Sequence, residues 1–191
     1  AWANHRISMM NPNACVIATP SDQAIFNEEA FRKNVLEGLA FVAENNHFLT
    51  MGVKPTRPEP GYGYIQMGDV LCDNIYQVQS FTEKPERDFA KIFMESGEFY
   101  WNTGLFLSNV SYLRKCFCKI LPPVLREYDK RYPEFSVETE NAYMKETFSS
   151  YPNISVDFGI LEKPSNVCVM KCDFGWADLG TWHSIYEAMQ K

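Results

Sequence analysis

Residues 14–53 read ACVIATPSDQAIFNEEAFRKNVLEGLAFVAENNHFLTMGV, and this stretch decides the fold class. The apolar run 14–18 is typical of a strand that is buried on both faces. Asn27 then offers a helix cap, and apolar residues follow it at helical spacing, at Phe31, Val35, Leu39 and Val42. Residues 47–53 form the next strand candidate. The order strand, helix, strand predicts a parallel sheet with right-handed crossover helices.

Later segments continue the alternation of strands and helices. Two β-rich runs, 64–67 and 75–81, predict a hairpin insertion whose turn lies around Gly68 and Asp69. Further elements are expected as helices over 86–96, 109–131 and 137–149 and as strands over 100–107 and 167–172. Gly97 can end its helix in a left-handed conformation, and Pro122-Pro123 can break one helix and start the next. Since no flexible linker appears, we expect one α/β domain over residues 1–191.

The composition is that of an ordinary soluble globular protein. The 191 residues are 46% apolar and 22% charged, and a formal charge of -6 argues against a general nucleic-acid binder. No apolar run approaches the roughly 20 residues that span a bilayer, and the start of the chain does not resemble a signal peptide. Six cysteines without a CxxC pair, at positions 15, 72, 116, 118, 168 and 172, predict buried free thiols in a reduced, cytoplasmic protein.

Two clusters with chemical potential follow the first predicted strands. Asp22 comes directly after the apolar run 14–18, at the edge where ligands sit in open parallel sheets, although it could simply cap the next segment. The motif EPGYGYI, residues 59–65, places Gly61 and Gly63 one residue apart. Glycines permit a close approach of the backbone to a ligand, and a tight entry into a hairpin explains them equally well.

Two further clusters lie beyond the hairpin. Glu83 and Lys84 in FTEKP can reach one ligand only if the strand ends or bends there, and Pro85 makes such a bend expected. A carboxylate accepts hydrogen bonds from sugar hydroxyls and an ammonium group binds phosphate, although a solvated strand end is an equal alternative. In FGWADLGTW, residues 174–182, Asp178 lies between glycines and tryptophans that could also serve only to anchor a loop.

The combination and order of these motifs resemble a known family, the mannose-1-phosphate guanylyltransferases. The resemblance runs from about Cys15 to the C-terminus and rests on PSDQ, PTRPEPGYGYI, FTEKP, FYWNTGLFL, ILEKP and FGWADLGTW. It implies a Rossmann-like α/β domain with a mixed sheet flanked by helices. It also implies an enzyme that uses Mg²⁺ to make GDP-mannose and pyrophosphate from GTP and mannose 1-phosphate, without nucleic-acid or membrane partners and possibly as a homo-oligomer.

The resemblance also implies roles for particular residues. Mannose would be bound by Gly61, Tyr62, Gly63, Glu83, Asn102 and Gly104, and a side chain in place of either Gly61 or Gly63 would intrude on the sugar. Lys84 and Lys163 would bind phosphate as the catalytic lysines. Asp22 and Asp178 would hold Mg²⁺, because hard oxygen ligands suit this ion.

Two departures from the family pattern matter. Gln23 stands where the family commonly has His, which puts a local hydrogen bond in question. The glycine-rich phosphate loop of the family would precede Ala1, so we expect residues 1–191 to be a partial catalytic domain, truncated at its N-terminus. Such a chain would carry the sugar-phosphate half of the site and be inactive alone. Two alternatives stay open: another sugar-1-phosphate nucleotidyltransferase, or a binding module of the same fold without catalysis.

Overall fold

The computed structural model describes residues 1–131, 136–161 and 166–190, and within these ranges the strands form a mixed sheet of six and a small sheet of two. The order in the large sheet is β1-β6-β3-β7-β5-β4. Its strands are β1 (Cys15–Ala18), β3 (Phe48–Val53), β4 (Tyr64–Cys72), β5 (Ile75–Thr82), β6 (Phe99–Asn109) and β7 (Val167–Cys172). The small sheet pairs β2 (Gln23–Ile25) with β8 (Trp176–Asp178). The expected mixed α/β sheet flanked by helices is confirmed.

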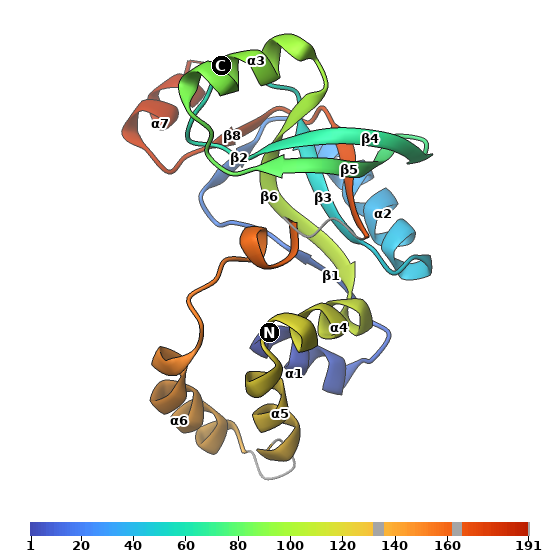
Figure 1. Cartoon of the computed structure of the whole chain (residues 1–191), viewed down its shortest axis with the longest axis vertical. Coiled ribbons are helices and arrows are strands. Elements are labelled where there is room, and N and C mark those ends of the chain that lie inside the picture. Colours follow the sequence, from blue (N-terminus) through green and yellow to red (C-terminus); the bar gives the residue numbers. More distant parts are fainter. Residues whose placement is uncertain (132–135, 162–165, 191) are drawn as a thin grey trace.

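Seven α-helices accompany the sheets within the described ranges. They are α1 (Trp2–Met10), α2 (Glu28–Glu44), α3 (Arg87–Ser96), α4 (Val110–Ile120), α5 (Pro122–Arg131), α6 (Val137–Thr147) and α7 (Trp182–Ala188), with short turns η2 (Phe148–Ser150) and η3 (Asp157–Leu161). Figure 1 shows α1, α4, α5 and α6 gathered at one end of the molecule, away from the β4–β5 hairpin. None of the helices in the described ranges is long and apolar enough to cross a membrane.

The predicted helix caps are confirmed. The Asn27 side chain accepts a hydrogen bond from the Ala30 backbone N–H at 3.0 Å, which satisfies one of the free donors at the start of α2. Gly97 ends α3 with φ +73°, a left-handed conformation that costs glycine little. These ends depend on neighbouring residues only, so they can be inferred without the tertiary structure.

Apolar side chains bury both faces of the large sheet. Along β7 they alternate: Cys168 and Met170 face the core that α2 covers, whereas Val167 and Val169 face the core shared with α4 and η3. All six residues of β3 are buried, so this central strand carries the apolar content expected of a strand covered on both sides. The sheet is therefore a rigid platform for the loops that leave its strand ends.

The predicted parallel arrangement of the first two strands is wrong in detail. β1 and β3 run in the same direction, but β6 lies between them and is antiparallel to both. The parallel pair is β3 with β7. β1 is also only partly buried, with Ala18 exposed, because it stands at one edge of the sheet. A local strand-helix-strand pattern cannot show that a strand from residues 99–109 inserts between its two strands.

The predicted hairpin forms, but its turn lies elsewhere. β4 continues past Gly68 and Asp69 to Cys72, and the chain reverses at Asp73 and Asn74, where Asp73 has φ +38°. The β4–β5 register shifts at several points, which absorbs the residues that looked like a turn.

The strand pairings close into a circuit. β6 pairs with β3, β3 with β7, β7 with β5, β5 with β4, and β4 with β6 again. Trp101 on β6 stands at the closure, because it is paired with Val53, the last residue of β3, and with Tyr64, the first residue of β4. The loop 54–63 therefore begins and ends next to the same residue of β6, Trp101.

The cysteines are free thiols, as predicted, but they are not all buried. Cys168 and Cys172 lie in the core, whereas Cys72 and Cys118 are exposed. Cys72 ends β4 next to the turn of the hairpin, and the apolar run in which it lies extends to the surface there. The expectation of burial is wrong for these two residues.

Candidate functional site

A cavity of about 240 Å³ brings together most of the residues predicted to form the site. Four carboxylates line it, those of Asp22, Glu83, Asp157 and Asp178, and we call it the acidic cavity. The other predicted residues along its wall are Gly61, Tyr62, Gly63, Lys84, Asn102 and Gly104. Lys163 lies outside the described residues. Five separate sequence motifs thus converge on one small space, and their roles in binding stay predictions.

The pairing of β2 with β8 brings Asp22 next to Asp178. Gln23 lies opposite Asp178 in this pair, and the Asp22 carbonyl accepts a hydrogen bond from the Leu179 backbone N–H at 2.8 Å. Asp178 Oδ1 accepts from the Gly180 N–H at 2.9 Å, which fixes its carboxylate. Within the described ranges no set of three or more His, Cys, Asp or Glu side chains could hold a metal ion, so any ion here would have few protein ligands.

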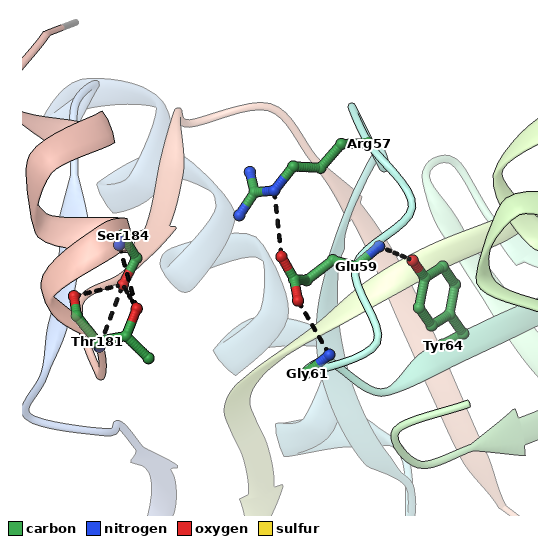
Figure 2. Close-up of polar contacts among 6 residues, drawn as sticks. All are labelled: Arg57, Glu59, Gly61, Tyr64, Thr181 and Ser184. Carbon is green, nitrogen blue, oxygen red and sulfur yellow. Dashed lines mark hydrogen bonds and ion pairs between the residues drawn. The ribbon is translucent and has the colours of Figure 1, made fainter. Parts of the chain in front are cut away.

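Glu59 organises the loop 54–63. Its carboxylate accepts hydrogen bonds from Arg57 Nε at 3.2 Å and from the Gly61 backbone N–H at 3.0 Å. Its own backbone N–H donates to the Tyr64 hydroxyl at 3.0 Å. Figure 2 shows these contacts holding the loop on one side, with Thr181, which directly precedes α7, and Ser184 of α7 across from it. The loop is thereby fixed before it reaches the cavity.

A side chain at Gly63 would come close to protein atoms and not only to a ligand. A Cβ atom on Gly63 would lie 2.6 Å from Glu83 Oε2 and 3.0 Å from two ring atoms of Phe81. A Cβ on Gly61 would meet only the Glu59 side chain, at 3.2 Å. The expected clash between a side chain here and a bound sugar stays untested. The structure shows that at Gly63 the group requiring close approach is the carboxylate of Glu83.

Glu83 and Lys84 both reach the cavity because the strand stops before them, as predicted. β5 ends at Thr82, and Lys84 has φ +48°, an uncommon conformation for a residue with a side chain. Pro85 restricts Lys84 further, so the surrounding structure must hold this strained backbone in place. Lys84 Nζ lies 3.4 Å from Glu83 Oε1, with the lysine side chain largely exposed and the glutamate side chain mostly buried. The ammonium group thus faces the mouth of the cavity.

A bulge in β6 presents Asn102 and Gly104. Thr50 pairs with Phe106 and Gly52 with Asn102, so β6 has two extra residues between these pairs. Gly104 takes φ +74° in the bulge and donates its N–H to Asn102 Oδ1 at 3.3 Å. A residue other than glycine would be strained at this position.

Gln23 braces the same bulge. Its Nε2 donates to the Thr103 carbonyl, which ties β2 to β6 across the cavity. A hydrogen bond therefore forms at this position, with the Gln23 amide as its donor.

Asp157 is a cavity residue that the sequence did not reveal. It begins η3 and accepts a hydrogen bond from Asn102 Nδ2 at 3.1 Å. It precedes the motif ILEKP and is not part of it, so only the tertiary contact with β6 reveals it. Glu59 was also missed as an organising residue, although a carboxylate two residues before a glycine N–H is a local turn signal that could have been recognised.

A second cavity, of about 510 Å³, adjoins the first. Tyr62, Trp101 and Trp176 contribute to its walls, and we call it the aromatic cavity. The Tyr62 ring packs edge-on against Trp101 at 5.1 Å and Trp176 at 5.2 Å between centroids. Burial, with the negative charge of Asp178, raises the pKa of Tyr62 and keeps its hydroxyl protonated. Tyr62 and Trp176 line both cavities, so these rings form the partition between them.

Comparisons with known proteins point to one family. The chain matches the Nucleotidyl transferase family over residues 8–191. It is 34% identical over 176 residues to a mannose-1-phosphate guanylyltransferase of Sinorhizobium fredii, covering 92% of this chain and 34% of that protein. It is 30% identical over 186 residues to the protein of the same name in Escherichia coli, covering 95% of this chain and 40% of that one.

A similar solved structure comes from Thermus thermophilus and is described as a mannose-1-phosphate geranyltransferase. It superposes with a TM-score of 0.83 at 26% sequence identity, covering 96% of this chain and 52% of that one. A Helicobacter pylori structure described as a mannose-6-phosphate isomerase has a TM-score of 0.73 at 22% identity, which speaks for the fold alone. The chain spans 34% to 40% of the length of the two curated relatives.

Proposed function

Because this chain belongs to the Nucleotidyl transferase family, we propose that the protein containing it makes GDP-mannose and pyrophosphate from GTP and mannose 1-phosphate. The observation that supports this proposal most is the acidic cavity, where Asp22, Gly63, Glu83, Asn102 and others converge from separate motifs. The relatives named for mannose 1-phosphate support the choice of sugar. That this chain is inactive alone stays a prediction.

In this proposal the reaction is an in-line displacement. An oxygen of the sugar phosphate attacks the α-phosphorus of GTP, the new P–O bond forms, and the bond from the α-phosphorus to the bridging oxygen breaks as pyrophosphate leaves. Little covalent chemistry is required of the protein, so positioning and charge neutralisation supply most of the acceleration. No nucleophilic side chain is needed.

The cavity residues divide this work. Glu83 accepts hydrogen bonds from sugar hydroxyls, because its carboxylate is held against Gly63 inside the cavity. Lys84 at the mouth places its ammonium group against the sugar phosphate and neutralises part of its charge. Its strained backbone favours a single direction for the side chain, which suits a positioning role. Lys163 is proposed as a second phosphate ligand from the family pattern alone.

The donors at Asp22 and Asp178 fit Mg²⁺. This ion is usually bound through one or two carboxylates together with substrate phosphates and water, and the paired strands β2 and β8 supply two such groups. The N–H of Gly180 fixes one oxygen of Asp178. When bound, the ion would offset negative charge on the reacting phosphates.

The test uses the complete gene product with GTP, mannose 1-phosphate and Mg²⁺, and measures pyrophosphate release and GDP-mannose by mass spectrometry. We expect GTP to be preferred over ATP, UTP and dTTP, and mannose 1-phosphate over glucose 1-phosphate. A preference for another base or sugar would show that the protein is a different nucleotidyltransferase. No pyrophosphate with any pair of substrates would overturn the proposal in favour of a binding module without catalysis.

A further inference from the structure

The aromatic cavity has no function in the reaction as proposed above. It lies over the carboxyl ends of β3 and β7, because Val53 and Cys172, the last residues of these strands, are paired and both line it. Ligands of α/β proteins commonly bind at the carboxyl ends of parallel strands. The cavity volume of about 510 Å³ also falls in the range of ligand pockets, about 300–1,000 Å³. Its position and its size are therefore those of a ligand site.

Three cations lie on the wall of this cavity, although the chain carries a net charge of -6. Among the described residues, the charged side chains of the wall are Lys54, Arg57, Lys171, Asp173 and Asp178. Arg57 is paired with Glu59. Asp178 is shared with the acidic cavity, where we propose that it binds Mg²⁺. The two lysines are therefore the cations that can bind an anion here.

Neither lysine is paired with a carboxylate in the part of the chain that the structure describes. The Lys171 ammonium lies 4.1 Å from the centre of the Tyr76 ring and 5.7 Å from that of Tyr100, so aromatic faces hold it in place. Lys171 is half-buried, and Lys54 is exposed. An ammonium group that is partly desolvated and has no carboxylate beside it attracts an anionic ligand.

Two indole N–H groups of the wall lack an acceptor. The nitrogen atoms Nε1 of Trp101 and Trp176 are buried and, within the described ranges, donate no hydrogen bond. Both rings line the cavity, and Trp101 is only 4% exposed. A buried donor without an acceptor costs free energy, so a ligand that brings acceptor oxygens to these rings is favoured. Phosphate and carboxylate groups supply such oxygens and also suit the lysines.

We propose that the aromatic cavity binds a second ligand, a small organic anion in which a phosphate or carboxylate group is attached to a flat ring. The anionic group pairs with Lys171 and Lys54 and accepts from the indole N–H groups, and the ring packs against the aromatic side chains of the wall. This ligand differs from the sugar phosphate, whose proposed site lies on the other side of Tyr62 and Trp176. Its binding goes beyond the proposed reaction and does not depend on it.

Ligand-observed NMR titrations of the complete gene product test this site with phenyl phosphate and benzoate, which carry the two kinds of anionic group on the same ring. At least one of them should bind more tightly than phenol, which lacks the charge, and than inorganic phosphate, which lacks the ring. The tighter of the two identifies the anionic group. Lys171→Met should weaken its binding about 10- to 100-fold, the range for loss of a hydrogen bond to a charged group. Lys33→Met is the matched control, because it removes a positive charge from the exposed face of α2, outside this cavity.

Lys54→Met provides a second test that does not put the fold at risk, because this side chain is exposed. It should weaken binding in the same direction as Lys171→Met. Wild-type binding in both variants, an equal loss in Lys33→Met, or no binding of either anion would overturn the proposal. Displacement of the probe by mannose 1-phosphate would also overturn it, because the probe would then lie in the acidic cavity. If the protein makes no GDP-mannose, the proposed function fails, and the lysine variants still decide whether the aromatic cavity binds an anion.

Discussion

Replacing Gly63 with alanine should damage the site through a contact that can be measured in the structure. The new Cβ would lie 2.6 Å from Glu83 Oε2, and real Cβ atoms essentially never approach closer than 3.0 Å. The carboxylate must therefore retreat by at least 0.4 Å, the difference between the two distances, and the Phe81 ring must also give way. Backbone strain adds nothing, because Gly63 is not among the glycines with positive φ.

The size of the effect follows from two terms. Overpacking costs about 1–3 kcal/mol of folding free energy, and for a protein of this size each kcal/mol lowers Tm by about 2–4 °C. Displacing the Glu83 carboxylate, which we propose to bind the sugar, by a fraction of an ångström should lower kcat/KM about 10- to 100-fold, since a misplacement of about 1 Å can cost about 100-fold.

Gly61→Ala is the matched control for stability, because Gly61 is itself predicted to bind the sugar and its variant is not expected to keep full activity. Its Cβ would meet only the end of the Glu59 side chain, at 3.2 Å, and alanine restricts the unfolded chain, which stabilises by about 0.4–1 kcal/mol. Thermal melting of the two variants in the complete gene product provides the comparison, and pyrophosphate release is measured for Gly63→Ala. An equal fall in Tm in both variants, or wild-type stability and activity of Gly63→Ala, would refute the close-approach argument.

Three further predictions concern charge and protonation. Lys84→Ala should lower kcat/KM for mannose 1-phosphate about 10- to 100-fold, whereas Lys91→Ala on the exposed face of α3 should leave it unchanged. The same kcat/KM in both variants would show that Lys84 does not bind the phosphate. Burial, together with the charge of the Arg114 guanidinium, lowers the pKa of His5 below 6.5. The unfolded chain therefore binds the proton more readily, and the free energy of unfolding should fall as the pH drops below about 6.5. Urea titrations at several pH values should show a weaker dependence of this free energy on pH in His5→Gln, and the same dependence in both proteins would contradict the prediction. Burial raises the pKa of Cys172 to about 12, so iodoacetamide should label exposed Cys72 in the native protein and Cys172 only after unfolding. Mass spectrometry of the labelled peptides measures this order, and labelling of Cys172 before Cys72 in the native protein would contradict the prediction.

The parts of the fold that depend on neighbouring residues were predictable. Asn27 and Gly97 define helix ends through their own side chain or backbone, and the strand 167–172 was found with the same bounds because its first four residues are apolar and only Lys171 interrupts the run. The insertion of β6 between β1 and β3 was not predictable, since it depends on pairing between residues far apart in the chain. Three-residue strands such as β2 and β8 carry too little pattern to be recognised.

The site divides in the same way. Glu83 and Lys84 were identified because their motif combines two useful charges with a proline that ends the strand. Asp157 was missed because a single aspartate at the start of a short apolar segment carries no local signal, and its partner Asn102 lies 55 positions away. Sequence motifs therefore identified most residues that line the acidic cavity, whereas the structure was needed to find the carboxylate that is held by another side chain.

Because the strand circuit closes at Trp101, the loop 54–63 could be replaced by another loop without changing the strands at its two ends. Its flanking residues, Val53 and Tyr64, are registered against the same residue of β6, so the distance that the loop must span is set by the sheet and not by the loop. Loops whose ends lie together tolerate changes in sequence and length at small entropic cost. Grafting another loop between these two positions should therefore retain the scaffold, while the carboxylates of the acidic cavity, which all lie outside this loop, stay in place.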